Sequence, residues 1–431
     1  MNEPFLHYLW RYQKFDFTNL KTTAGASLAV VRVGEANSGS GPDFSNAQLR
    51  LDSLLFAGSV EIHLRSSGWY QHDHHKDIAY DGVVLHVVWE HDREVLLPSG
   101  ALLPTLALKT YVRSETLSYY RQHFLQQQKA LPCTPFAPQL PVAVWKHWRE
   151  RLFLERLEGR LLLLQERLEV LRYDWEALLF ERLARAFGLN RNGAVFEQLA
   201  QSIPFSVVRK VAISREDLEA LFLGQAGLLS QTSAPLTPYG AQLAKRFRYL
   251  QHKFTLPSLT GLGVQFGRLR PHNFPTLRLA QLAQLYHQFP QLFERIHQLS
   301  HLEGLSFLEG VGVSPYWQTH YSLHSTAPPV RQPQARKLTA DFRSLLLINA
   351  VIPLLYAHAN WQGRDRSDWL FQQMEAVPQE KNSRVDGFRR MGLPISTALD
   401  SQALLQLYPH YCERLRCLQC ALGFFIMKQS P

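Results

Sequence analysis

The strongest constraint on the fold is a change in the spacing of apolar residues on either side of a proline-rich segment. Before residue 113, short runs alternate apolar and polar residues, which is the period of β-strands. After residue 142, apolar residues recur at three- and four-residue steps, which is typical of amphipathic helices. The segment between 131 and 142 contains four prolines, which disfavour both helix and strand, so we expect a linker there.

The expected fold is therefore an α+β N-terminal domain with a mixed or antiparallel sheet, followed by an all-α C-terminal region. Its parts are an α+β domain over 1–130, the linker over 131–142 and a basic helical region over 143–431. The N-terminal domain is expected to open with a helix over Asn2–Phe15 and to continue with strands over Leu28–Val33, Ala47–Phe56, Ser59–Arg65, Val83–Glu90, Glu94–Leu97 and Thr105–Val112. Helices are expected over Leu152–Phe187, Arg215–Leu223, Pro238–His252, Leu277–Leu299, Asp341–Ala359 and Ser401–Met427.

Composition favours a globular, cytoplasmic protein. Hydrophobic residues make up 46% of the 431, enough to bury a core without disulfides. The opening Met1-Asn2-Glu3-Pro4 lacks a basic segment, so we expect no secretory signal. The most apolar later segment, Leu345–Ala359, is interrupted by Asn349 and Pro353, and we expect it to be too short to span a bilayer.

The excess positive charge lies in the C-terminal part of the chain. Residues 1–130 hold 12 Lys and Arg against 13 Asp and Glu, whereas the remainder holds 34 against 23. Such a field attracts phosphate-rich partners such as nucleic acid without reading their sequence. A solvated basic helical surface is the alternative, and the charge alone does not decide between them.

The segment Gly41-Pro42-Asp43-Phe44 and the run Val60-Glu61-Ile62-His63-Leu64 carry the first candidate site. Alternation along a strand places Glu61 and His63 on one face, away from the apolar residues between them. One hairpin can bring Asp43 to Glu61, and paired carboxylates suit a divalent cation such as Mg²⁺ or Mn²⁺. Glu35 is a candidate third oxygen ligand. The alternative is a turn Asp and a strand Glu that pairs with a basic residue.

This arrangement resembles the PD-(D/E)XK nuclease superfamily, in which an Asp after a Pro and an acid-x-Lys strand hold Mg²⁺ at a small mixed sheet. Pro42 and Asp43 match the first part, and Glu61-Ile62-His63 matches the second with His in place of Lys. The wider stretch that includes His72-Asp73-His74-His75-Lys76-Asp77 and Val84-Leu85-His86-Val87-Val88-Trp89 resembles an uncharacterised bacterial family of unknown function. The nuclease resemblance implies Asp43, Glu61 and His63 as catalytic residues.

Histidines form a second candidate site. His72, His74, His75 and Asp77 lie in one run, and His86 follows on a later strand, with flanking residues that favour burial. Neutral imidazoles suit Zn²⁺ and other transition metals. We expect His75, Asp77 and His86 to join Glu61 and His63 if the two strands are adjacent; the alternative for His86 is a hydrogen-bonded core residue.

Cysteines and arginines supply two further candidate sites. Cys412, Cys417 and Cys420 have the C-x4-C-x2-C spacing of three ligands of plant-type ferredoxins, and Cys133 would complete a thiolate site for Zn²⁺ or an iron–sulfur cluster. Buried free thiols are the alternative. Guanidinium groups beside a helix N-terminus suit phosphate, and the candidates are Arg268, Arg270 and Arg278. The alternative to phosphate binding is that these arginines pair with acidic side chains at the surface.

Two function classes follow from these candidates. The first is a metal-dependent phosphodiesterase or nuclease, with the helical region as the platform for nucleic acid. The second is a non-catalytic nucleic-acid-binding or scaffold protein with a degenerate nuclease-like fold. A phosphate-binding GxxxxGK[ST] loop and a GxSxG nucleophile motif are both missing from the sequence, which disfavours ATPase and α/β-hydrolase functions.

Overall fold

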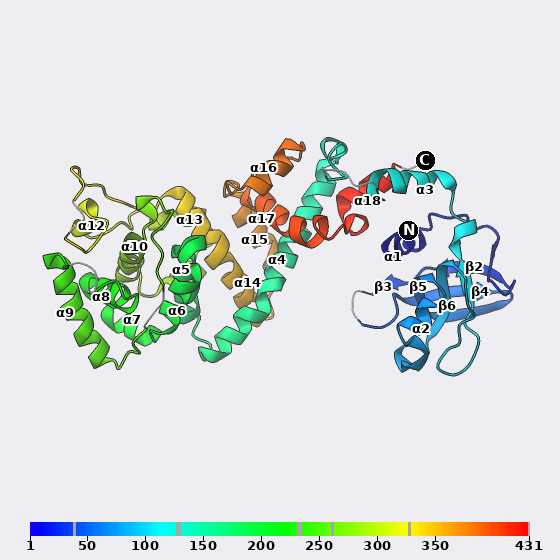
Figure 1. Ribbon diagram of the computed structural model, residues 1–431, viewed down its shortest axis with the longest axis horizontal. Coiled ribbons are helices and arrows are strands. Elements are labelled where there is room, and N and C mark those ends of the chain that lie inside the picture. The colour runs from blue at the N-terminus through cyan, green and yellow to red at the C-terminus, as the bar shows by residue number, and fades with distance from the viewer. Residues whose placement is uncertain (38–39, 126–130, 231–234, 260–262, 326–328, 430–431) are drawn as a thin grey trace. The chain divides into compact units, whose positions relative to one another are not determined.

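A computed structural model describes the chain except residues 38–39, 126–130, 231–234, 260–262, 326–328 and 430–431 (Figure 1). The chain forms two compact units. Unit 1 comprises Met1–Trp148, Gly387–Leu393 and Leu407–Pro431, and unit 2 comprises Arg149–Asp386 and Pro394–Gln406. A mixed sheet occupies the N-terminal part and a mostly helical region follows, which confirms the fold class expected from the sequence. The expected domain boundaries stay predictions, because compactness does not test independent folding.

The sheet of unit 1 has the strand order β1-β2-β4-β5-β6-β7, and β3 pairs with β4. Neighbouring strands from β1 to β5 are antiparallel, whereas β5–β6 and β6–β7 are parallel. The strands are β1 Leu20–Lys21, β2 Ser27–Arg32, β3 Glu35–Ala36, β4 Phe44–Leu51, β5 Leu54–Arg65, β6 Val83–Glu90 and β7 Thr105–Ala107. The short helices of this part are α1 Glu3–Arg11, α2 Gly68–Gln71, η1 His74–Lys76, η2 Ile78–Tyr80, η3 Leu108–Thr110, α3 Ser114–Tyr120, η4 Arg121–Leu125 and η5 Ala137–Gln139.

Three of the expected strands differ in the structure: one is divided, one does not form and one is shorter. The expected strand Ala47–Phe56 divides at Asp52, whose left-handed φ of 50° forms the tight turn between β4 and β5. The prediction of a strand over Glu94–Leu97 is wrong, because Leu96 forms only an isolated bridge to Leu102. The strand expected over Thr105–Val112 ends at Ala107, and the chain continues as the short helix η3.

Strand β5 changes partner along its length, and Gly58 allows the change. A Cβ at Gly58 would lie 2.4 Å from Val84 Cγ1 and 2.6 Å from the Gly82 carbonyl oxygen. The missing side chain therefore lets β6 approach where it begins to pair with β5. Beyond this point both faces of β5 are covered, and the run from Val60 to His63 is buried.

Helix α1 covers one face of the sheet. Asn2 caps it by accepting a hydrogen bond from the Phe5 N–H, which satisfies a backbone donor of the first turn. Phe5, Leu6 and Leu9 share one core with the sheet, and the Trp10 indole N–H donates to the Val33 carbonyl at 3.0 Å. The same core contains Met427, from the other end of the chain.

The stretch Ser401–Met427, of which the part from Leu407 belongs to unit 1, is not the single helix expected from the sequence. Helix α17 (Ala398–Leu407) passes into η9 (Tyr408–Cys412), and after a break the chain forms η10 (Cys417–Gln419) and α18 (Ala421–Lys428). The break contains Leu415 in a left-handed conformation with φ of 52°. The Phe424 ring of α18 lies 4.6 Å from the Tyr12 ring, so this segment packs beside the end of α1.

Unit 2 is mostly helical in its described residues and has a continuous apolar core. Its elements are α4 Val142–Val170, which begins in unit 1, α5 Trp175–Phe187, α6 Leu189–Gln201, α7 Phe205–Val211, α8 Arg215–Gln225, α9 Pro238–Lys253, η6 Pro271–Asn273, α10 Pro275–Gln288, α11 Leu292–His297, η7 Glu303–Leu308, α12 Pro315–Thr319, α13 Ala340–Leu346, η8 Leu347–Val351, α14 Ile352–Trp361, α15 Ser367–Glu375 and α16 Ser383–Arg390. The expected helix over Leu277–Leu299 is divided between α10 and α11.

The run from α13 to α14 is longer than the sequence suggested. Ala340–Trp361 forms one helical stretch of 22 residues, long and apolar enough by composition to cross a membrane. In the structure, 72% of its most apolar window is buried among other helices, which is typical of a core helix in a globular protein. Pro353 is tolerated because it lies in the first turn of α14, after a π-helical turn.

Candidate metal centre

Two neighbouring strands hold the middle of the candidate site. β5 and β6 are parallel and pair Glu61 with His86, while alternation along β5 puts His63 on the face of Glu61. On the other face, Val60 and Ile62 enter the core beneath α1. The sheet therefore presents Glu61, His63 and His86 together, away from the apolar core.

The segment between β5 and β6 covers this face and adds two histidines. Helix α2 lies directly on the His63 ring, because a Cβ at Gly68 would be only 2.8 Å from His63 Cδ2. After α2, Asp73 adopts a left-handed φ of 58°, which Asp tolerates better than most residues. The chain turns there, and the His72 and His74 rings lie 5.5 Å apart.

The imidazoles form a chain of contacts. His63 Nδ1 lies 2.9 Å from His86 Nε2, and His63 Nε2 lies 3.1 Å from His72 Nδ1. A neutral imidazole has one N–H, so His63 donates in one contact and accepts in the other. His86 thereby fixes the orientation of the His63 ring and directs His63 Nε2 toward His72.

Glu61 closes the group on the side of His74. Glu61 Oε1 is 3.2 Å from His74 Nε2 and 3.8 Å from His63 Nε2. The His74 contact is short but not aligned as a hydrogen bond, and among the described residues His74 Nε2 has no hydrogen-bond partner. A buried nitrogen in this condition is uncommon, and a cation shared with Glu61 would satisfy it.

Asp43 is tied to Glu61 through the backbone. The Asp43 N–H donates to Glu61 Oε2 at 3.0 Å, and the Ile62 N–H donates to Asp43 Oδ2 at 2.9 Å. The same Asp43 oxygen lies 3.4 Å from His7 Nε2. The Asp43 side chain is 25% exposed and His72 is exposed, so solvent reaches the group from their side. We call Asp43, Glu61, His63, His72, His74 and His86 the histidine–carboxylate centre.

Burial sets the protonation states of this centre. Burial, and then the Asp43 carboxylate, raises the pKa of Glu61 to about 8. Burial, and then the neighbouring His86 and His72, lowers the pKa of His63 to about 3, and burial lowers that of His86 to about 3. His63 and His86 are thus neutral near pH 7, whereas Glu61 keeps a proton unless a cation compensates its charge.

The centre fits a divalent transition metal. The donor atoms of His63, His72 and His74 all lie within 4.8 Å of one another. Two imidazoles on a tetrahedral Zn²⁺ would have their nitrogens about 3.3 Å apart, from a Zn–N distance of about 2.0–2.1 Å. The 3.1 Å between His63 Nε2 and His72 Nδ1 is close to that value. Three nitrogens with a carboxylate favour Zn²⁺ or Mn²⁺ over Mg²⁺, which prefers an all-oxygen shell.

The structure brings only some of the predicted ligands together. Glu35 lies on the edge strand β3 and bonds to Arg32 at 2.5 Å. His75 packs beside the Tyr70 ring, with ring centroids 5.1 Å apart, and Asp77 accepts a hydrogen bond from the Ala79 N–H as the cap of η2. The ligand prediction left out His72 and His74. Their approach depends on the left-handed Asp73, which no periodic pattern reveals.

The candidate phosphate-binding arginines are in different environments. Arg268 and Arg270 are exposed ahead of α10. Arg278 is only 7% exposed; its guanidinium lies 3.6 Å from the centre of the Phe342 ring and donates to Gln281. Its expected phosphate contact therefore competes with contacts inside unit 2. The four cysteines, Cys133, Cys412, Cys417 and Cys420, line one pocket in unit 1.

Fold and site together define a two-unit protein whose mixed sheet carries a histidine–carboxylate centre. Residues 3–383 match the model of the family described as protein of unknown function (DUF2851), and the chain belongs to that family. This confirms the expected resemblance to an uncharacterised family. No curated protein and no solved structure gives a significant match. The nuclease resemblance stays a prediction, because these comparisons do not confirm it.

Proposed function

We propose that this protein is a divalent-metal-dependent phosphodiesterase that acts on nucleic acid at the histidine–carboxylate centre. The observation that carries the proposal is a group of three imidazoles, whose donor nitrogens on His63, His72 and His74 lie within 4.8 Å of one another, with the Glu61 carboxylate beside His63 and His74. The small mixed sheet and the Asp43–Glu61 pairing also agree with what the nuclease resemblance implies.

Each residue of the centre has a role in this proposal. His63, His72, His74 and Glu61 would hold the metal, which when bound polarises a phosphate and lowers the pKa of water. His86 positions His63 through the 2.9 Å contact between their rings. Asp43, on the solvent side, is placed to accept a proton from water or to contact the metal.

Nucleic acid is the proposed substrate class because the excess positive charge lies outside residues 1–130. A polyanion is held by such charge through counterion release, without sequence reading. Arg268 and Arg270 are exposed and lead into α10, so their guanidinium groups are available to phosphates.

The second candidate function is a non-catalytic nucleic-acid-binding protein. One observation favours it: both ring nitrogens of His63 contact other imidazoles, His86 and His72. Neither ring nitrogen of His63 is therefore free to activate water, which is the role that the nuclease resemblance gives to a Lys amine at the same position.

A cleavage assay with the full-length protein separates these functions. Single- and double-stranded DNA and RNA are incubated with the protein in Mg²⁺, Mn²⁺ or Zn²⁺, and products are followed on denaturing gels. We expect cleavage in Mn²⁺ or Zn²⁺ that is lost in Glu61→Gln and retained in Glu90→Gln. Glu90 is the matched control because it is a partly exposed acid on the adjacent strand β6, where it pairs with Lys109 outside the histidine–carboxylate centre. Nucleic-acid binding without cleavage in every metal would support the second candidate.

A further inference from the structure

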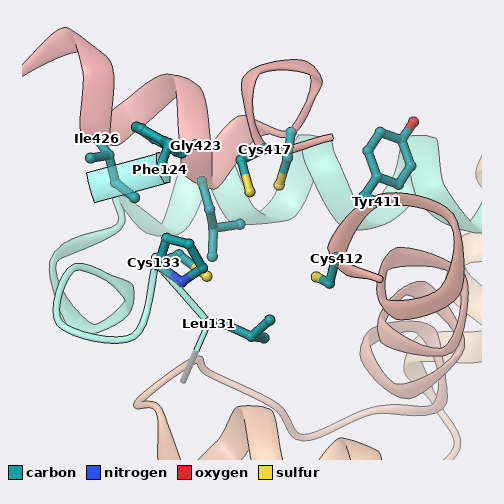
Figure 2. A pocket seen from close by; sticks show the side chains of 11 residues that line it. Phe124, Leu131, Cys133, Tyr411, Cys412, Cys417, Gly423 and Ile426 are labelled. Atoms are coloured by element: carbon teal, nitrogen blue, oxygen red, sulfur yellow. The ribbon is translucent and has the colours of Figure 1, made fainter. Parts of the chain in front are cut away.

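All four cysteines of the chain line one small pocket in unit 1 (Figure 2). One thiol comes from the segment after η4, and three come from the C-terminal segment; they are Cys133, Cys412, Cys417 and Cys420. In Figure 2 the labelled Cys133, Cys412 and Cys417 reach the same space from different segments. Apolar side chains such as Leu422 and Ile426 complete the lining.

The backbone of the C-terminal segment is shaped to bring its thiols together. Cys412 ends η9, and the left-handed Leu415 turns the chain before Cys417 opens η10. Cys420 then occupies the N-cap position of α18. Gly423 allows this packing, because a Cβ there would lie 1.8 Å from the Cys417 carbonyl oxygen. The close approach of η10 to α18 therefore requires glycine.

Burial favours the protonated form of these thiols. All four are free, and burial raises the pKa of Cys133 to about 12 and that of Cys420 to about 11. Each anionic sulfur would also repel its neighbours in the same apolar pocket. The nearby backbone N–H groups of Leu422 and Gly423 act in the opposite direction and lower the pKa of Cys420. Such donors stabilise a metal-bound thiolate.

The spacing of the sulfurs indicates which kind of centre fits. In a tetrahedral zinc site, all sulfurs would be about 3.8 Å apart, from a Zn–S distance of about 2.3 Å. Across the part of the chain that the structure describes, no three of the four sulfurs lie within 4.8 Å of one another. Iron–sulfur clusters separate their thiolates more widely, because each thiolate binds an iron and inorganic sulfide bridges the irons.

We propose that Cys133, Cys412, Cys417 and Cys420 together hold an iron–sulfur cluster. Assembly would take iron and inorganic sulfide, and each thiol would lose its proton on ligation. The cluster fastens the C-terminal segment to the chain near residue 133. The loop closed in this way contains the whole of unit 2, and closing a longer loop removes more entropy from the unfolded chain.

The test is elemental and spectroscopic analysis of the full-length protein, purified without oxygen. We expect two or four irons per chain, an equal amount of acid-labile sulfide and visible absorption from sulfide-to-iron charge transfer. Cys417→Ser should lose the iron and sulfide, and Gly423→Ala should lower them by displacing Cys417. His74→Ala is the control: it alters the histidine–carboxylate centre and should keep the full iron and sulfide content.

Three results would overturn the proposal. Zinc without sulfide would assign the thiols to a mononuclear site. No metal, with four thiols that react after denaturation, would make them ordinary buried thiols. Iron that is lost in His74→Ala but kept in Cys417→Ser would place it at the other centre. Wild-type content is measured first, so the proposal can fail even if a cysteine variant does not fold.

Discussion

Asp43 and Glu61 are joined in both directions: the Asp43 N–H donates to the Glu61 carboxylate, and the N–H next to Glu61, that of Ile62, donates to the Asp43 carboxylate. Each carboxylate is therefore held by the backbone that carries the other. This reciprocal contact places two acids side by side in a largely buried site. Their mutual repulsion is part of why the Glu61 pKa is raised to about 8.

Metal binding near pH 7 should release about one proton, because Glu61 is mostly protonated in the metal-free protein. His63 contributes none, since its pKa of about 3 keeps it neutral. Calorimetric titration with Mn²⁺ or Zn²⁺ in buffers of different ionisation enthalpy measures the number. Release should fall toward zero above pH 9 and vanish in Glu61→Gln. An unchanged value in Glu61→Gln would exclude Glu61 as its source.

The stability that Glu61 contributes to the metal-free protein should decrease as pH rises from 5 to 9, whereas His63 and His86, whose pKa values are lowered, act in the opposite direction below a pH of about 6.5. The folded-state pKa of Glu61 is raised, so its contribution is fully present below the unfolded pKa of about 4.5 and lost as pH passes through about 8. The change is on the order of a few kcal/mol at β5. Hydrogen exchange of β5 amides in EDTA measures it. Glu61→Gln should flatten this dependence, and an equal slope in both proteins would contradict the assignment.

Removal of His72 should weaken metal binding more than removal of His75. His72 Nδ1 belongs to the donor group, whereas His75 packs beside Tyr70. His72→Ala should lose more than the roughly 10- to 100-fold that an outer-shell change costs. His75→Ala is the matched control, because it removes an imidazole from the same segment. Equal affinities of the two variants, measured by competition with a chelating dye, would move the metal elsewhere.

Arginines around α10 should separate into binding and structural roles. Arg268→Ala and Arg270→Ala should each weaken nucleic-acid binding and reduce the slope of log affinity against log salt by about 1. Arg278→Ala should instead lower the stability of unit 2, because its guanidinium is buried against Phe342. Fluorescence anisotropy at several salt concentrations and thermal unfolding give the two readouts. A salt slope unaffected by both exposed arginines would remove them from the interface.

Asp400 should matter to unit 2 far more than a surface acid. It is 1% exposed, pairs with Arg149 at 2.9 Å and accepts hydrogen bonds from the backbone N–H groups of Ser396 and Thr397. Asp400→Ala should destabilise the unit by about 1–3 kcal/mol, because Arg149 loses one acidic partner and keeps Glu375, and the Ser396 and Thr397 N–H groups lose their acceptor. Asp341→Ala, which breaks an exposed pair with Lys381, should cost less than about 1 kcal/mol. Urea unfolding compares them, and similar losses would contradict the buried-pair argument.

Local periodicity predicted the sheet and the shared face of Glu61 and His63, because strand alternation depends only on neighbouring residues. It did not predict that His72 and His74 meet, since that contact depends on the left-handed Asp73 and on the close packing of Gly68 against His63. Glu35 was a reasonable oxygen ligand by composition alone. Its partner on the edge strand, Arg32, is decided by tertiary structure.

Local spacing was also insufficient to predict the structure of the C-terminal segment. Apolar spacing predicted one helix over Ser401–Met427, but the left-handed Leu415 interrupts it and separates Cys412 from Cys417. Cysteine spacing suggested a shared centre. The approach of Cys133 to the other three could not be read from the sequence, because it depends on the return of the chain to unit 1.

That return has a consequence for synthesis. The sheet emerges from the ribosome before unit 2, yet its core also contains Met427, which is made after unit 2. At about 5–20 residues per second, roughly 15–60 s separate residue 130 from residue 427. During that interval the apolar surface that Met427 covers has no partner from its own chain. A nascent chain of this protein is therefore expected to be a client of ribosome-associated chaperones until Met427 has emerged.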